Sequence, residues 1–419
     1  MEDESPLMNQ SVIILDDIIY QISKDTPTVP EGAEVIDGNG KYLVPGLAEM
    51  HAHIPTPEQG EDLIEETLFL YLAGGVTTIR GMLGHPRHLE LRKQVEDGTV
   101  LGPRIYTSGP SLNGNTVPDI ETATKMVREQ KAAGYDFLKL HPGIKLEVFD
   151  AMVRTAKEVG MPYAGHVSRE VGVRHAINSD YASIDHIDGY VEGLVPTEKA
   201  VDPQENGFFG INFTDLVDES LLPELINSSV DHGVWIVPTQ CLAERWAGPV
   251  PTEELMADPE MSYMSQSTLD NWSQSKTNMM SNSAYDPEKA QRWIDLRRRI
   301  IKEMYHNGVG VLLGSDAPQV FNVPGFALQH EIEMYVGAGL TPYQALETGT
   351  VNPAIYFDQQ HRTGMIKEGY QADLIMVDGN PLDDISNLDR REGVMIRGKW
   401  LSREYLDQRL AEIAGNHAN

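Results

Sequence analysis

Short apolar segments alternate with amphipathic ones along most of the chain, between Gly46 and Gly339. Eight of the apolar segments have the length and residue types of strands. They cover residues 43–50, 76–81, 104–108, 137–141, 163–167, 183–187, 234–239 and 310–315. Strands that alternate with helices form a parallel sheet covered by helices. Eight of them predict an α/β fold, a (β/α)8 TIM barrel.

The amphipathic segments between these strands have the helical period. Apolar residues that share one helix face are Val148, Met152, Ala156 and Val159 in one segment, and Trp293, Leu296, Ile300 and Met304 in another. Gly134 and Gly160 follow predicted helices and immediately precede strands, where a left-handed residue ends a helix. The period and the stops support the alternating arrangement.

The two ends of the chain have a different pattern, with short strands separated by turns. We expect residues 1–42 and 363–419 to pair into one small β-sandwich, and residues 43–362 to form the barrel. A polar, acidic stretch at about 242–287 interrupts the barrel rhythm. It is interpreted either as a helical lid or subunit contact, or as a solvated insertion.

Composition excludes some classes of protein. The chain has 419 residues, of which 41% are hydrophobic, which suits a large folded unit. No apolar run approaches the roughly 18 residues of a membrane-spanning helix, so we expect a soluble protein. The net charge of −30 disfavours nucleic acid and anionic membrane surfaces as partners. The single cysteine, Cys241, excludes an internal disulfide and is expected to be a packed thiol.

The sequence His51-Ala52-His53 closes the first apolar strand. Residues i and i+2 of a strand project to the same face, so the two imidazoles can converge on one metal ion. The carboxyl end of a strand is the catalytic face of such a barrel. Taken alone, the pair is equally compatible with two surface histidines.

Other polar residues occupy the same position at the ends of later strands. They are Lys139, His166, His186 and Asp316. Polar residues that end four apolar strands are hard to explain by packing, and in a barrel they would face one another across the mouth. Together with His51 and His53 they predict a metal site.

This ordered set resembles the binuclear members of the amidohydrolase superfamily, and within it the prolidase-like and imidazolonepropionase-like peptidases. The resemblance includes residues 44–47 (VPGL) before the histidine pair, 75–80 (GVTTIR), 314–317 (GSDA) and the tail 364–374 (GMIKEGYQADL). It implies two divalent metal ions. Imidazole and carboxylate ligands suit zinc and also tolerate manganese or cobalt. The resemblance also implies a carbamate on Lys139, which a mononuclear deaminase would not need.

The resemblance implies a role for each ligand. His51, His53 and Asp316 would hold the more buried metal, His166 and His186 the more exposed one, and the Lys139 carbamate would bridge both. A hydroxide shared by the metals would attack a C–N amide bond. Asp316 would take the water proton and deliver it to the leaving nitrogen.

Other residues are candidates for the substrate side. His141 is expected to contact the substrate carbonyl or oxyanion, or to be an orienting or loop histidine. Arg80 either binds a substrate carboxylate or pairs with a carboxylate of the protein. Weaker candidates for substrate contacts are Tyr190, Gln240 and His330. The chain departs from the common pattern at Gly81, where relatives have Asp, and in the long insertion.

The resemblance implies a metal-dependent hydrolase of a dipeptide or N-acyl amino acid. It also implies that the β-sandwich lacks its first strand. Two alternatives stay open: the same site acting on a lactone, phosphotriester or cyclic amide, and a non-catalytic binding protein with this fold. The resemblance allows a homo-oligomer. Residues 1–6 carry no export signal, and export remains compatible with a start upstream of Met1.

Overall fold

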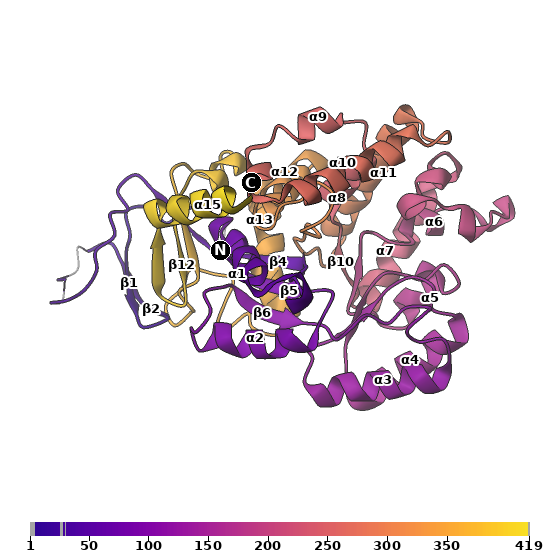
Figure 1. The fold of residues 1–419 in the computed structure, drawn as a ribbon, viewed down its shortest axis with the longest axis horizontal. Helices are drawn as coiled ribbons and strands as arrows, with labels where there is room; N and C mark the ends of the chain where they lie inside the picture. The colour runs from indigo at the N-terminus through magenta and orange to yellow at the C-terminus, as the bar shows by residue number, and fades with distance from the viewer. Residues whose placement is uncertain (1–4, 26–27, 30, 418–419) are drawn as a thin grey trace.

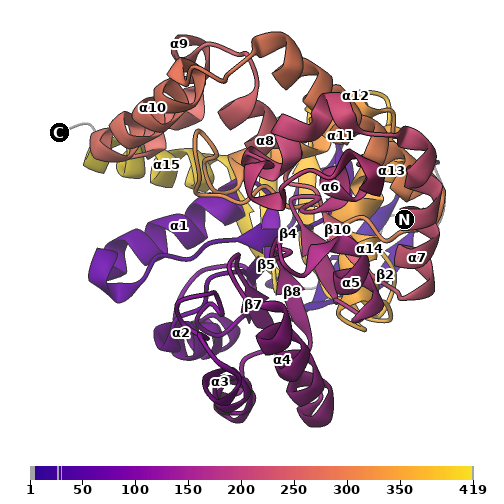
Figure 2. The same ribbon diagram turned by 90° about the vertical axis from the view of Figure 1, so that its right-hand side faces the viewer.

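Seven parallel strands form two central sheets in this computed structural model, which describes residues 5–25, 28–29 and 31–417. The first sheet contains β4 (Leu47–Ala52), β5 (Val76–Gly81) and β6 (Arg104–Thr107); the second contains β7 (Leu138–Leu140), β8 (Tyr163–Gly165), β9 (Ser183–Asp185) and β10 (Trp235–Val237). Seven of the eight predicted strands are therefore present, and the α/β class is confirmed (Figures 1 and 2). Residues 1–4, on which much of the prediction about export rests, lie outside the described ranges.

The eighth predicted strand, 310–315, has only one β-bridge, from Val311 to Ile236 of β10. On its other side, Leu313 O accepts a 2.8 Å hydrogen bond from Met50 N of β4. A longer strand does not form because Leu313 N donates to Thr348 O at 2.9 Å instead of to a strand. The segment still lies between β10 and β4, so it links the two ends of the central strand order.

The two central sheets also contact each other at β6 and β7, where Ser108 and Phe137 form a parallel bridge. His141 N donates to Leu112 O at 2.8 Å, and Leu112 N donates to Lys139 O at 2.9 Å. The residues that follow β6 therefore pair with β7. The carboxyl ends of the neighbouring strands lie at one common edge.

The first predicted strand is divided at Gly46. Residues on one side form β3 (Tyr42–Pro45), which pairs antiparallel with β11 (Leu374–Val377), and those on the other side form β4. Gly46 is required because a Cβ atom there would lie 2.2 Å from Thr77 Oγ1. The chain thus passes from the peripheral sheet into the central one within a single residue.

The terminal segments lie together at one side of the molecule (Figure 1). The peripheral sheet has the order β13-β12-β11-β3, with β12 at Arg391–Ile396 and β13 at Lys399–Ser402. The hairpin of β1 (Ser11–Leu15) and β2 (Ile18–Ser23) is tied to residues before β11 by Ile19 N, which donates to Tyr370 O at 2.8 Å. Ile19 is fully buried against Leu374, so a shared apolar layer joins the two ends of the chain.

Helices surround the central sheets. Their bounds are α1 (Glu61–Ala73), α2 (Pro86–Glu96), α3 (Ile120–Ala133), α4 (Leu146–Val159), α5 (Gly172–Asn178), α6 (Tyr190–Gly193), α7 (Leu222–Asp231), α8 (Gln240–Ala247), α9 (Thr252–Leu255), α10 (Gln266–Ser281), α11 (Pro287–His306), α12 (Phe326–Ala338), α13 (Pro342–Gly349), α14 (Val351–Tyr356) and α15 (Arg403–His417). The predicted apolar faces of α4 and α11 are largely buried, and Gly134 and Gly160 end α3 and α4 with φ of 88° and 61°. Within the described ranges, no helix has both the length and the apolar character needed to cross a bilayer.

The predicted insertion at 242–287 is helical and packed. It contains α9, a 3-10 helix at Pro259–Tyr263 and α10. Met261 and Trp272 are buried in an apolar cluster with Phe321, and the rings of Trp272 and Phe321 lie 6.0 Å apart. The insertion therefore rests on the loop that follows Asp316, which disfavours a merely solvated segment.

Candidate metal centre

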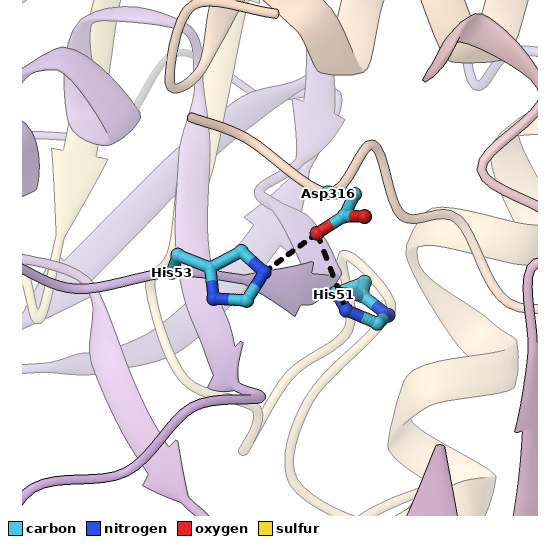
Figure 3. A group of neighbouring side chains, drawn as sticks. All are labelled: His51, His53 and Asp316. Atoms are coloured by element: carbon cyan, nitrogen blue, oxygen red, sulfur yellow. Dashed lines mark hydrogen bonds and ion pairs between the residues drawn. The ribbon is translucent and has the colours of Figure 1, made fainter. Parts of the chain in front are cut away.

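Three side chains meet at the carboxyl end of β4 (Figure 3). The Nε2 atom of His53 lies 2.6 Å from Asp316 Oδ1, and the Nε2 atom of His51 lies 3.3 Å from the same oxygen. The two imidazoles come from positions i and i+2 at the end of one strand, so both project to the same face. Two nitrogens and a carboxylate at this spacing suit a divalent cation of intermediate softness.

The three remaining predicted ligands surround this group. Lys139 Nζ lies 3.4 Å from His51 Nε2, and the rings of His186 and His51 have centroids 4.6 Å apart. His166 follows, with its ring centroid 4.4 Å from that of His186. His186 Nδ1 also lies 3.8 Å from Asp316 Oδ2. The structure therefore brings all six predicted ligands together in one contiguous group.

Two of the imidazoles are oriented by residues that the sequence analysis did not single out. His186 Nδ1 hydrogen-bonds to Thr239 Oγ1 at 2.8 Å, and His166 Nδ1 to Asp188 Oδ2 at 3.1 Å. A ligating histidine commonly uses its second ring nitrogen in this way, which fixes the tautomer and the ring plane. In both rings the Nε2 atom is thereby directed as the ligand atom.

Asp185 is the third such residue, and it is completely buried. Its Oδ2 atom lies 3.1 Å from His51 Nδ1 and 3.7 Å from Lys139 Nζ, while its Oδ1 atom accepts from Arg80 at 3.1 Å. Burial alone would raise the pKa of the Asp185 carboxyl. The neighbouring groups, Arg80 and Lys139 foremost, together outweigh burial, so the pKa is lowered overall. A charged Asp185 therefore contacts His51, Lys139 and Arg80 at the same time. Its position directly before His186 was the available sequence signal.

Burial favours the uncharged form of four of the six predicted ligands. It lowers the pKa of His51 and His186 well below the usual value, lowers that of His166 to about 3, and lowers that of Lys139. Neutral imidazoles are the form that binds metal. The Nε2 atom of His186 is buried and has no hydrogen-bond partner among the described residues, a costly state that a bound cation would relieve. The donor set therefore fits divalent metal.

The strand ends that carry the ligands have unusual backbone conformations. His186, Thr239 and Asp316 have φ of 63°, 46° and 65°, in the left-handed region that non-glycine residues rarely adopt. The fully buried guanidinium of Arg297 on α11 donates to His186 O at 2.7 Å and to Pro238 O at 2.8 Å. Such strain concentrates at functional sites. Arg297 holds two of these turns together.

The structure gives Arg80 protein partners in place of the predicted substrate carboxylate. Arg80 is fully buried and donates to Met50 O at 2.7 Å and Ser183 Oγ at 2.9 Å, besides Asp185. A guanidinium so enclosed has no free face for substrate. The contacts favour the alternative, in which Arg80 pairs with a carboxylate of the protein.

The three weaker substrate candidates also bind protein groups. Tyr190 and Gln240 are fully buried; the Tyr190 hydroxyl bonds to Ser229 Oγ at 2.8 Å, and Gln240 Oε1 accepts from Arg297 at 2.9 Å. His330 Nε2 lies 2.7 Å from Glu260 Oε1. Within the described ranges, no hydrogen bond or ion pair links these three side chains to the six clustered ligands. Their chain positions suggested the mouth, but their side chains point into helix contacts.

His141 lies where the centre meets an open cleft of about 630 Å³. Its ring is stacked on that of His166 with centroids 5.0 Å apart, and its Nδ1 atom is 2.6 Å from Ser111 Oγ. Asn113 and Asn115 line the same cleft, and its described lining contains no carboxylate, lysine or arginine. His141 is therefore the residue that both lines this cleft and contacts one of the six predicted ligands.

Replacing Asp188 with Asn is expected to weaken metal binding by roughly 10- to 100-fold, because His166 loses its carboxylate partner. Metal competition against a fluorescent chelator measures the change. Asp180→Asn is a matched control, since Asp180 makes the same kind of carboxylate–imidazole contact, with the half-buried His232 at 2.7 Å, and neither residue is one of the six ligands. Equal metal affinity in both variants would contradict the orienting role.

Comparison with known proteins agrees with this geometry. Residues 42–401 match the amidohydrolase family. The chain is 23% identical to ochratoxinase of Aspergillus niger over 412 residues, which covers 91% of this chain and 80% of that protein. It is also similar to the solved structures of a bottromycin amidohydrolase (TM-score 0.73, 22% identity, 98% of this chain and 86% of that one) and of a putative prolidase from Bifidobacterium longum (TM-score 0.68, 22% identity, 96% and 93%). The two structural matches show a shared fold.

Proposed function

Because the chain belongs to the amidohydrolase family and is a hydrolase acting on carbon–nitrogen bonds, we propose that it cleaves the amide bond of a dipeptide or an N-acyl amino acid. The reaction would use two divalent metal ions, for which zinc is the first candidate. The observation that carries the proposal is the convergence of His51, His53, Lys139 and Asp316 at the carboxyl ends of parallel strands. Similarity to proteins named prolidase and Xaa-Pro dipeptidase supports the substrate class.

The fold proposed for this site is a single (β/α)8 barrel. The order β4 to β10 is parallel throughout, and bridges at Ser108 and Val311 connect the two sheets and the 310–317 segment. Asp316 N donates to His51 O at 3.0 Å, so the segment that carries Asp316 adjoins β4. Residues on strands that follow one another around a barrel all face the same mouth. The terminal sheets form the accessory β-sandwich in this proposal.

The six ligands would divide between two metals. His51, His53 and Asp316 would hold one ion, and His166 and His186 the other. Lys139 would bridge them as a carbamate, because burial lowers the pKa of its amine and favours the neutral form that reacts with carbon dioxide. When bound, the ions supply polarisation of the scissile carbonyl and acidify water.

The side chains of the centre move protons and orient the substrate. Asp316 has one oxygen shared by both histidines of β4, while Oδ2 lies 3.8 Å from His186, so its carboxylate can accept a proton from water and return it to the leaving nitrogen. His141 stands between the ligands and the cleft, where it can hydrogen-bond the substrate carbonyl. Ser111 holds its Nδ1 side, which leaves Nε2 for that contact.

Metal content per chain and a substrate panel test the proposal together. We expect two metal ions in the purified protein by elemental analysis, and hydrolysis of dipeptides or N-acyl amino acids. The panel pairs each free acid with its C-terminal amide, because Arg80 is not free to bind a carboxylate. It also contains a lactone, a cyclic amide and a phosphotriester. Turnover of these alone, with no linear amide hydrolysed, would overturn the proposed reaction.

A further inference from the structure

One aromatic side chain outside the six ligands lies directly against them. Phe209 belongs to a 3-10 segment at Phe208–Leu216, between α6 and α7. Its ring is nearly parallel to those of His186 and His166, at centroid distances of 5.0 and 6.0 Å and interplanar angles of 20° and 16°. A phenyl ring therefore stacks on two of the predicted ligand imidazoles.

The segment that carries Phe209 is shaped to place this ring. Phe209 itself has a left-handed conformation, with φ of 45° and ψ of 46°, and lies between Gly207 and Gly210, which have φ of 72° and 82°. Bulky residues rarely adopt that region, so surrounding contacts must hold it. The indole of Trp293 donates to Phe209 O at 3.1 Å, and Phe208 packs 5.0 Å from the Trp246 ring.

The rest of the segment is braced as well. Asn212 N donates to Asn206 O at 3.0 Å, and the Asn212 side chain donates to Glu205 O at 2.8 Å. These bonds give the backbone around Phe209 a defined path. Phe209 is nevertheless only half-buried.

We propose that Phe209 is a specificity-determining residue whose ring forms an apolar wall at the His186 side of the centre and selects amides with an apolar, preferably aromatic, group next to the scissile bond. The inference rests on the proposed amide hydrolysis and narrows its substrate class. The two sides of the centre differ in chemistry: His141, Ser111 and Asn113 make the cleft polar, whereas Phe209 offers a flat hydrocarbon surface. An aromatic substrate group gains both apolar burial and ring stacking there.

The test compares matched substrates that differ in one group. Wild type and the Phe209→Ala and Phe209→Leu variants are assayed on N-benzoylglycine against N-acetylglycine, and on N-acetylphenylalanine against N-acetylglycine. In at least one pair, wild type is expected to have a higher kcat/KM for the aromatic substrate than for N-acetylglycine. Phe209→Ala is expected to lower the ratio of these two kcat/KM values about tenfold. Phe209→Leu keeps an apolar surface and should retain most of the preference.

A matched control separates selectivity from a structural effect. Phe208→Ala changes the neighbouring ring, which packs on Phe209, Trp246 and Trp293 and has no ring contact with the histidines among the described residues. We expect Phe208→Ala to lower kcat/KM by the same factor for both substrates of a pair. An unchanged ratio in Phe209→Ala, the same ratio change in Phe208→Ala, or a ratio that rises because bulkier groups now fit, would overturn the proposal.

Binding of hydroxamates makes the inference independent of turnover. The metal-loaded wild type is expected to bind benzohydroxamate more tightly than acetohydroxamate. In Phe209→Ala the ratio of the two dissociation constants is expected to shift about tenfold against benzohydroxamate. If wild type hydrolyses no amide, the proposed reaction fails while this comparison still measures the role of the ring. Equal binding of the two hydroxamates by wild type would overturn the assignment of Phe209.

Discussion

Replacement of Asp316 with Asn is expected to lower kcat/KM for amide hydrolysis by about a thousandfold. The amide cannot accept a proton from water or return it to the leaving nitrogen, although it can still accept a hydrogen bond from His53. The backbone bond from Asp316 N to His51 O is unaffected, so the fold should persist. Steady-state kinetics and circular dichroism check the two parts of this expectation, and metal content is measured on the same preparations.

Asp258→Asn is the matched control for that experiment. Asp258 lies near Glu260 and His330 in a second group of carboxylates and imidazole, and its carboxylate bonds to Arg245. It is the same chemical change outside the proposed centre, and we expect kcat/KM to stay within about threefold of wild type. If Asp316→Asn kept a tenth or more of the activity, Asp316 would not be the proton-transferring group.

The six ligand positions could be predicted because each is a local signal. A polar residue at the end of an apolar strand can be read from the sequence, and parallel strands place such ends at one edge. His166 and His186 directly follow β8 and β9, Lys139 lies within the short β7, and the structure brings their side chains together. The chain's apolar periods also predicted the strand and helix order, because central parallel strands are buried on both faces.

The contacts behind the ligands could not be predicted in the same way. Asp185 and Asp188 stand close to His186 in the sequence, but only the fold decides that one reaches His51 and the other His166. Arg80 ends an apolar strand as the ligands do, yet its long side chain turns inward to Met50 O. Strand-end position alone does not distinguish a group that faces the mouth from one that closes the interior.

Irregular segments limited the prediction further. The segment at 310–315 has the apolar content of a strand, but its backbone donors bind Thr348 O and the Glu49 carboxylate instead of a complete strand ladder. Phe209 lies in a segment without helical or strand period, bent by two glycines. Periodicity detects regular elements, so a loop residue that folds back onto the centre leaves no signal of this kind.

Lys139→Ala is expected to leave at most one metal ion per chain and to lower kcat/KM by at least about a hundredfold. The Lys139 amine lies in the middle of the group, with Nζ 3.4 Å from His51 Nε2 and 3.7 Å from Asp185 Oδ2, and alanine removes every atom that could bridge two ions. Elemental analysis and kinetics on the same samples measure both effects. Loss of a metal ion together with activity is the result that a bridging role requires.

Lys276→Ala distinguishes that result from simple destabilisation. Lys276 on α10 is equally buried, and its ammonium donates to Arg245 O at 2.8 Å and Gly248 O at 2.6 Å, so its removal also leaves a cavity and unpaired carbonyls. We expect a lower melting temperature in both variants but full metal content only in Lys276→Ala. Two metals retained in Lys139→Ala would instead show that the ligands of β4, β8 and β9 hold both ions without a lysine bridge.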